Sequence, residues 1–213
     1  MVLPDGVALA DLSRFTSRAL RVDPGGSIRL VGHGDVLAVY CCAISGGRGP
    51  TVLGLRTLVL AEPARLDVTV DLETLRDRLA RLRGQDKPGI RLELMPGAGA
   101  GPAWAGLLPP RTGWSIEGLL EPAVLREVAA AGIEEVAAGI PAGAGAAAVT
   151  QLRSTVWGRD LAAGSHLPAG AAFAVSAYGF LGDEAVSVHR SGPWWRLSLL
   201  RGHVLARRSG SLG

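Results

Sequence analysis

Short apolar segments of two different periods, separated by glycine and proline, run along the whole 213-residue chain. Residues 8–20 and 72–82 repeat their apolar side chains at helical spacing, whereas residues 27–61 contain the continuous or alternating apolar runs of strands. With 48% hydrophobic and 19% charged residues, the chain is long enough to bury a sizeable core. These patterns predict an α+β fold class, with one large domain or two small ones.

The first 95 residues are expected to form an antiparallel meander with helices. A helix over residues 8–20 ends at a Pro-Gly-Gly break, and strands follow over residues 27–33, 36–45 and 51–61. A tight turn at residues 32–35 and a second turn at 46–50 are expected to join them. Asp71 is the expected N-cap of an amphipathic helix that Gly84 ends. A fourth strand is predicted over residues 91–95.

The second half is expected to be helical and to end in a small β-meander. Residues 96–120, rich in proline and glycine and containing Trp104 and Trp114, are predicted to be an ordered crossover. Pro122 begins a helix that Pro141 ends, and two more helices follow. The last strands are expected at residues 185–189, 194–200 and 203–207. The predicted domains are therefore 1–95, the 96–120 crossover and 121–213, with the two halves packed as one unit.

The charge pattern argues against a nucleic-acid partner. Lys87 is the one lysine beside 21 arginines, a composition typical of GC-rich genomes, and the net charge is only +3. The arginines alternate with acids instead of forming the dense basic stripe of a nucleic-acid binder. Residues 167–181, the longest apolar stretch, are too short to span a bilayer, and the first residues do not resemble a signal peptide. The sequence predicts a cytoplasmic protein with no membrane contact.

The two cysteines, Cys41 and Cys42, are adjacent and lie inside an apolar run that predicts a strand. Neighbours on a strand face opposite sides, so one thiol is expected in the core and the other on the opposite face. No basic residue beside them would lower a thiol pKa, which favours a packing role over a reactive one.

No catalytic motif is found. The Gly-Ala-Gly-Ala-Gly run of residues 97–101 is followed by proline instead of a helix, which argues against a dinucleotide or phosphate loop. The Ser165-His166 pair lacks the context of a nucleophile elbow. Histidines are scattered without the spacing of metal ligands, at His33, His166, His189 and His203. The sequence predicts no cofactor and no metal site, and leaves open whether the protein is an enzyme.

The strongest candidate for recognition is a pair of tryptophans, Trp194 and Trp195, on a predicted strand near the C-terminus. Adjacent strand residues face opposite ways, so at least one indole should face solvent or another element. Arg190 and Arg196 flank the pair, and a surface of tryptophan and arginine suits stacking on a ring or on a partner's anchor residue. These four residues form the predicted binding site, with ordinary packing as the alternative.

Several segments of the chain resemble an uncharacterised protein family of GC-rich actinobacteria. They are residues 156–161, 174–182 and 191–197, together with residues 11–15 and 109–114. The resemblance implies a bacterial, cytoplasmic setting, but it implies no fold, activity or site residues.

Two hypotheses from different classes remain. The first is a non-enzymatic binding or protein-interaction protein that binds a protein partner or associates with itself. The alternative is an enzyme acting on a small-molecule ligand in a cleft between the two halves, for instance near His33 and Asp35.

Overall fold

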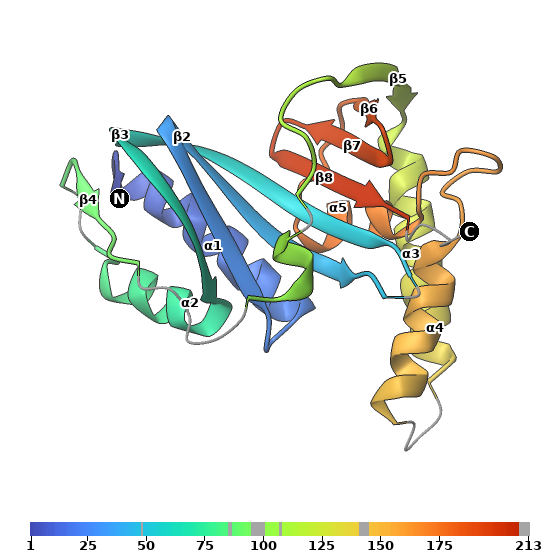
Figure 1. The fold of residues 1–213 in the computed structure, drawn as a ribbon. Helices are drawn as coiled ribbons and strands as arrows, with labels where there is room; N and C mark the ends of the chain where they lie inside the picture. Colours follow the sequence, from blue (N-terminus) through green and yellow to red (C-terminus); the bar gives the residue numbers. More distant parts are fainter. Residues whose placement is uncertain (48, 85–86, 95–100, 107, 141–144, 209–213) are drawn as a thin grey trace. The chain divides into compact units, whose positions relative to one another are not determined.

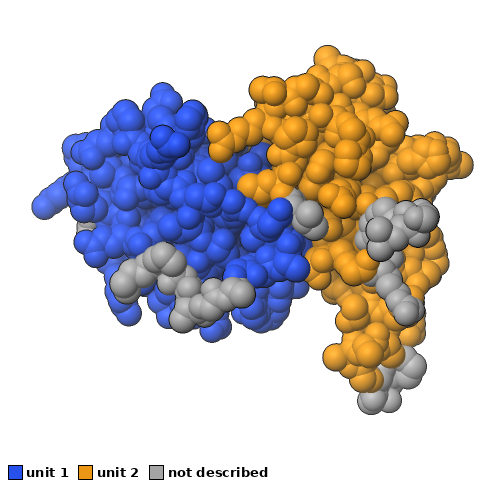
Figure 2. All heavy atoms as spheres, viewed as in Figure 1, with its two compact units in different colours: residues 1–42, 55–107 blue, residues 43–54, 108–213 orange. Residues whose placement is uncertain are grey.

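The computed structural model describes residues 1–213 except 48, 85–86, 95–100, 107, 141–144 and 209–213. The chain forms two compact units (Figures 1 and 2). Unit 1 consists of residues 1–42 and 55–107, and unit 2 of residues 43–54 and 108–213. Helices and strands occur together in the described parts of the chain, which confirms the α+β class. No helix among the described residues is long and apolar enough to cross a bilayer.

Unit 1 contains two helices that pack against each other, α1 (Gly6–Val22) and α2 (Leu72–Arg81). Both confirm the predicted helices. The side chain of Asp5 caps α1 by accepting a hydrogen bond from the backbone N–H of Ala8 at 2.8 Å. Asp71 occupies the expected N-cap position of α2, but its side chain makes no capping hydrogen bond. Gly84, beyond the helix, has a φ of +82°.

The N-terminal strands are longer than the sequence predicts. Strand β2 (Ser27–Ser45) is continuous, so the turn predicted at residues 32–35 is wrong. Buried positions change from even numbers, Ile28 and Leu30, to odd numbers from Leu37 onward, and Gly34 between them has a φ of +62°. A glycine of positive φ that shifts the alternation by one residue is typical of a β-bulge. Its turn-like sequence therefore marks an irregularity inside one strand.

Strand β3 (Thr51–Asp71) continues ten residues beyond the predicted strand end at residue 61, through Pro63. The short strands β1 (Val2–Leu3) and β4 (Ile90–Arg91) pair antiparallel. Of the predicted strand 91–95, only Arg91 belongs to β4; residues 92–94 lie in no strand, so this prediction is wrong there, and residue 95 lies outside the described residues. A 3-10 turn, η1 (Ala103–Gly106), completes unit 1 and buries Trp104.

Unit 2 contains the helices α3 (Pro122–Ala138), α4 (Ala146–Gly158) and α5 (Gly170–Ala177). Pro122 begins α3 as predicted; Pro141, its predicted end, lies outside the described residues. The strands are β5 (Ser115–Leu120), β6 (Val186–Ser191), β7 (Trp194–Leu199) and β8 (Gly202–Arg207). The last three confirm the predicted terminal meander, whereas β5 is an unpredicted strand within residues 96–120. The six-stranded sheet has the order β2-β3-β8-β7-β6-β5.

Small residues allow the helices of unit 2 to pack closely. Helix α5 contacts α3, α4 and β8, and five of its eight residues are buried. Trp157 of α4 is only 1% exposed and stacks on Phe173 of α5 at 4.8 Å between ring centroids. Gly132 of α3 faces this indole, and a Cβ atom there would lie 2.3 Å from Cζ3 of Trp157. The ring therefore fits only against a residue without a side chain.

Replacing Gly132 by Ala should destabilise the protein even though alanine favours helices. The clash with Trp157 should cost about 1–3 kcal/mol of unfolding free energy, more than the ~1 kcal/mol that alanine gains in helix propensity. Urea unfolding measures the difference. The control is Gly145→Ala, because a Cβ atom there meets nothing within 4 Å. Equal stabilities of the two variants would contradict the packing of Trp157 against α3.

Candidate functional site

The terminal sheet of unit 2 has two chemically different faces because its strands pair in a fixed antiparallel register. Val188 is opposite Leu197, which is opposite Val204, and His189 is opposite Arg196. Successive side chains point to opposite faces, so these two rows lie on opposite sides of the sheet. One face is buried: Val186, Val188, Leu197, Leu199, Val204 and Ala206. The other, which we call the polar face, carries the half-buried Ser187, His189, Arg196, Ser198 and His203, together with the buried Trp194 and Leu205.

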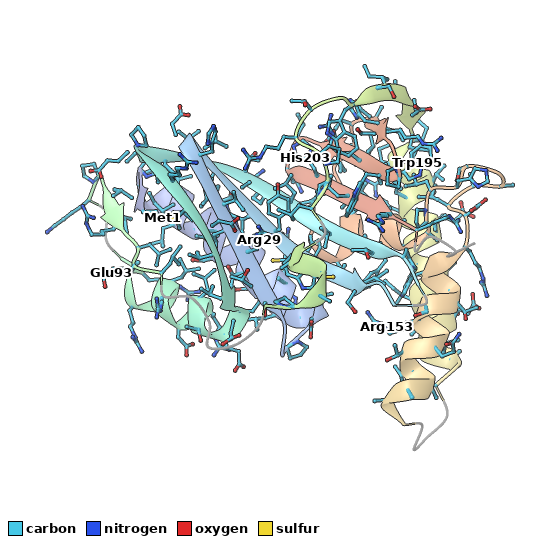
Figure 3. The ribbon with its side chains drawn as sticks, in the orientation of Figure 1. Met1, Arg29, Glu93, Arg153, Trp195 and His203 are labelled. Atoms are coloured by element: carbon cyan, nitrogen blue, oxygen red, sulfur yellow. The ribbon has the colours of Figure 1, made fainter. Side chains whose placement is uncertain are left out.

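The two predicted tryptophans lie on opposite faces, as expected. Trp194 lies on the side of Arg196 and is 4% exposed, so it is a packed residue. Trp195 lies on the side of Leu197 and is half-buried. Figure 3 labels Trp195. The guanidinium of Arg190, its partner in the strand register, lies 5.1 Å from the centroid of the Trp195 ring. Whether Trp194, Trp195, Arg190 and Arg196 bind a partner stays a prediction.

Arg196 contacts a tryptophan that the sequence did not assign to the site. Its guanidinium lies 4.7 Å from the ring centroid of Trp114, just before β5. Trp114 is fixed in turn by a hydrogen bond from its Nε1–H to the carbonyl oxygen of Pro110 at 3.0 Å. The sequence gives no signal for this pair, because the two residues are 82 positions apart.

The polar face includes polar atoms that have no hydrogen-bond partner. Nε of Arg196 and Nδ1 of His189 are both shielded from solvent and neither has a partner among the described residues. Desolvation lowers the pKa of Arg196 from its ordinary value. His203 differs, since its Nδ1 lies 3.1 Å from Oγ of Ser198.

Strand β5 is the last strand of the sheet and exposes apolar side chains. Ile116 is 75% exposed and Leu119 is 67% exposed. Ile116 is opposite His189, and Leu119 is opposite Ser187, so both extend the polar face. The register shifts between Ile116 and Gly118, where the chain bulges. The outer edge of β5 thus combines backbone groups that pair with no strand of the described sheet and a pair of exposed apolar side chains.

A second surface feature lies in unit 1, where a groove of about 800 Å³ follows α1. Arg14, Arg18 and Arg21 recur along one side of the helix, and Arg83 beyond α2 adds a fourth cation. Ser13 and Ser17 also line the groove, although their hydroxyls donate to backbone carbonyls within the helix. The exposed Arg14 lies 3.9 Å from Asp11, a weak ion pair because that carboxylate also pairs with Arg56 at 2.7 Å.

The residues that could have supported catalysis or metal binding are dispersed. Within the described ranges, no three His, Cys, Asp or Glu side chains are grouped so as to hold a metal ion. His33 and Asp35 are exposed in the middle of β2. Ser165 accepts hydrogen bonds from the backbone N–H groups of Ala162 and Leu167, each at 3.3 Å, which is a loop-stabilising role. Most of the glycine-rich run at 97–101 lies outside the described residues.

The cysteine pair confirms the predicted alternation. Cys41 is 1% exposed and Cys42 is half-buried. Burial raises the pKa of the Cys41 thiol well above its ordinary value, and the neighbouring Cys42 raises it further. Since the thiolate is the reactive form, burial and a raised pKa both favour a packing role for Cys41.

Two family descriptions together cover nearly the whole chain. Residues 1–106 match a "Domain of unknown function (DUF8010)", and residues 109–211 match a "Domain of unknown function (DUF8185)". The boundary between the two matches falls at residues 107–108, close to the beginning of the second segment of unit 2. No curated protein matches the chain in sequence.

Structural similarity to solved proteins extends over the whole chain. A putative DNA polymerase III beta subunit from Eubacterium rectale ATCC 33656 matches with a TM-score of 0.52 at 8% identity. The DNA polymerase III subunit beta of Pseudomonas aeruginosa matches with 0.52 at 14% identity. Both matches cover 100% of this chain and 66% of the other. A DNA polymerase sliding clamp from Pseudomonas aeruginosa matches with 0.51 at 14% identity, over 100% of this chain and 65% of that one.

The fold is similar to that of a sliding clamp. The chain spans slightly less than two thirds of the length of these structures. At such identities the likeness concerns the fold alone.

The two cysteines should differ in reactivity toward iodoacetamide at pH 8. A Cys42→Ser variant, which keeps Cys41, should be alkylated at least about tenfold more slowly than a Cys41→Ala variant, because burial shields the Cys41 thiol from the reagent and its raised pKa leaves less of the reactive thiolate. Mass spectrometry follows the labelling, and the same reaction in urea should make the two rates equal. Rapid labelling of Cys41 in the folded protein would contradict its burial.

Proposed function

We propose that this chain is a non-enzymatic protein-interaction protein with a clamp-like fold, and that it associates with a second copy through β5. The observation that carries the proposal is the outer edge of β5, with Ile116 and Leu119 exposed beside it. A sheet edge of this kind is a template for a further strand, and apolar side chains next to it add burial on association. Glu117 is the one charged residue within the strand.

The similar structures support a protein-interaction role. They are named as sliding clamps and beta subunits of DNA polymerase, and a subunit works through contacts with other chains. The cytoplasmic, actinobacterial setting expected from the sequence stays a prediction.

Charging the edge should abolish self-association. An Ile116→Glu/Leu119→Glu variant should sediment as a monomer at concentrations where the wild-type protein forms dimers, because two buried carboxylates would repel and need desolvation. The control is Val59→Glu/Leu200→Glu, which changes two apolar residues that are 64% and 82% exposed and lie outside β5. A wild-type protein that stays monomeric at about 1 mM, where association is worth only about 4 kcal/mol, would contradict the proposal.

Native mass spectrometry tests the enzyme alternative. A dimer without extra mass is the expected result. A mass increment that disappears on denaturation would identify a bound small molecule and would favour an enzyme.

The arginine groove of unit 1 supports a second candidate function, contact with nucleic acid. The sequence argued against it because arginines and acids alternate, but the fold gathers Arg14, Arg18, Arg21 and Arg83 around one groove. Guanidinium groups bind phosphate oxygens well, and several of them along a helix suit a phosphate backbone. The names of the similar structures refer to DNA polymerase, which fits the same chemistry.

Replacing Arg14, Arg18 and Arg21 together by Gln should weaken binding to duplex DNA. The slope of log affinity against log salt should fall by about 0.9 per lost phosphate contact, or roughly 2.7 in total. Fluorescence anisotropy at several salt concentrations measures both quantities. A variant with Arg65, Arg111 and Arg201 replaced by Gln carries the same change in net charge on exposed residues that do not line the groove. Equal losses in the two variants, or no wild-type binding at low salt, would exclude this candidate.

A further inference from the structure

Arg196 differs from Arg29 and Arg56, two half-buried arginines of unit 1, because it has no carboxylate partner among the described residues. Arg29, whose side chain is 19% exposed, donates two hydrogen bonds of 2.7 Å to the carboxylate of Asp67. Arg56, at 24%, pairs with Asp11 at 2.7 Å. Arg196 is also half-buried, yet it forms no hydrogen bond and no ion pair with any described residue. Among the described residues, the guanidinium of Arg196 has one cation–π contact, with the ring of Trp114.

The neighbours of Arg196 on the polar face do not neutralise its charge. His189 faces it from β6 and has its own unpartnered Nδ1, whereas Leu205 faces it from β8. Glu117 on β5 accepts a hydrogen bond from Ser115 at 3.1 Å. A half-buried cation without a counter-charge is unfavourable because desolvation is not offset by attraction. An anion bound from outside would supply what the protein itself supplies to Arg29 and Arg56.

The surroundings of Arg196 distinguish among anions. One guanidinium fork matches one carboxylate in a bidentate pair. Trp114 covers one side of the guanidinium, and the exposed Ile116 belongs to the same cross-strand row, next to His189. Leu119 adds a second exposed apolar side chain on the same face. An acidic side chain flanked by apolar ones complements this arrangement in charge and in polarity.

We propose that the polar face binds an acidic residue of a protein partner, with Arg196 as its ionic contact and the ring of Trp114 as the apolar surface beside it. That the partner is a protein rests on the proposed function. The anion site itself rests on the absence of a carboxylate partner for Arg196 among the described residues. Trp114 holds the guanidinium in place by stacking, so that little side-chain freedom is lost on binding.

The test uses two capped peptides, acetyl-Leu-Glu-Leu-amide and its Gln counterpart, which differ in charge alone. Heteronuclear NMR of the full chain reports binding through the indole N–H signal of Trp114. The Glu peptide should bind at least about tenfold more tightly than the Gln peptide, the preference expected for one charge-assisted hydrogen bond. In Arg196→Met, which keeps an unbranched side chain against Trp114, the preference should disappear.

Two further variants make the result specific. Arg190→Met removes the other arginine that stacks on a tryptophan and should keep the preference for Glu. Arg196→Lys keeps the charge but loses the bidentate fork, so it should retain part of the preference, and it serves if the Met variant does not fold. Equal binding of the two peptides to the wild-type protein, or an undiminished preference in Arg196→Met, would overturn the anion site.

The failure of this inference can be distinguished from the failure of the proposed function. Arg196 lies on β7, two strands from the outer edge of β5, so Arg196→Met should sediment like the wild-type protein. Loss of peptide preference with unchanged dimers is the expected result. A preference for Glu in a protein that never dimerises would keep the anion site and remove only β5-mediated association.

Discussion

The antiparallel register of β5 to β8 is the constraint on which the terminal sheet of unit 2 depends. It places Val188, Leu197 and Val204 in one row, and His189, Arg196 and Leu205 in the next row on the other face. A shift of one residue in any strand would send its apolar side chains to the wrong face. The burial of one face against helices therefore fixes the composition of the other, and the polar face is a consequence of how the core is built.

Close packing in unit 2 makes that register rigid. Helix α5 has five of its eight residues buried and contacts β8, α3 and α4, so it joins the sheet to the helical layer. Gly132 and Trp157 show how little room the layer leaves, because the indole occupies the space of a missing side chain. Interiors at this density transmit displacement instead of absorbing it. The positions of Arg196 and Trp114 are thus set by contacts on both sides of the sheet.

The sequence predicted the elements whose signals are local. The periodic leucines of α2, Pro122 at the start of α3 and the glycine turns between β6, β7 and β8 each depend on a few neighbouring residues, and the structure has these elements. The prediction failed where one local signal is compatible with two structures. Gly34 resembles a turn residue, yet it lies within a strand that continues for eleven residues beyond it, because pairing in a sheet overrides a local preference. Strand β5 was missed within a segment whose proline and glycine content is typical of loops.

The candidate site was predictable only in part for the same reason. Trp194, Trp195, Arg190 and Arg196 stand out in the sequence by residue type and proximity, and alternation correctly separates the two tryptophans. Which arginine meets which ring depends on strand register and on Trp114, 82 residues before Arg196. The sequence gives even less indication that Arg196 has no counter-charge among the described residues, because that depends on every side chain that the fold brings close to it.

The presence or absence of a carboxylate partner distinguishes arginines that hold the fold together from arginines that can bind an anion from outside. Arg29 and Arg56 are satisfied within unit 1, and their charge is already used to hold β2 to β3 and β3 to α1. Arg190 stacks on Trp195 but is exposed, so water solvates its charge at little cost. Arg196 has neither a carboxylate partner among the described residues nor full access to water, and the exposed Ile116 lies in the same cross-strand row beyond His189. That combination of desolvation and polarity is typical of the centre of an interface and not of its rim.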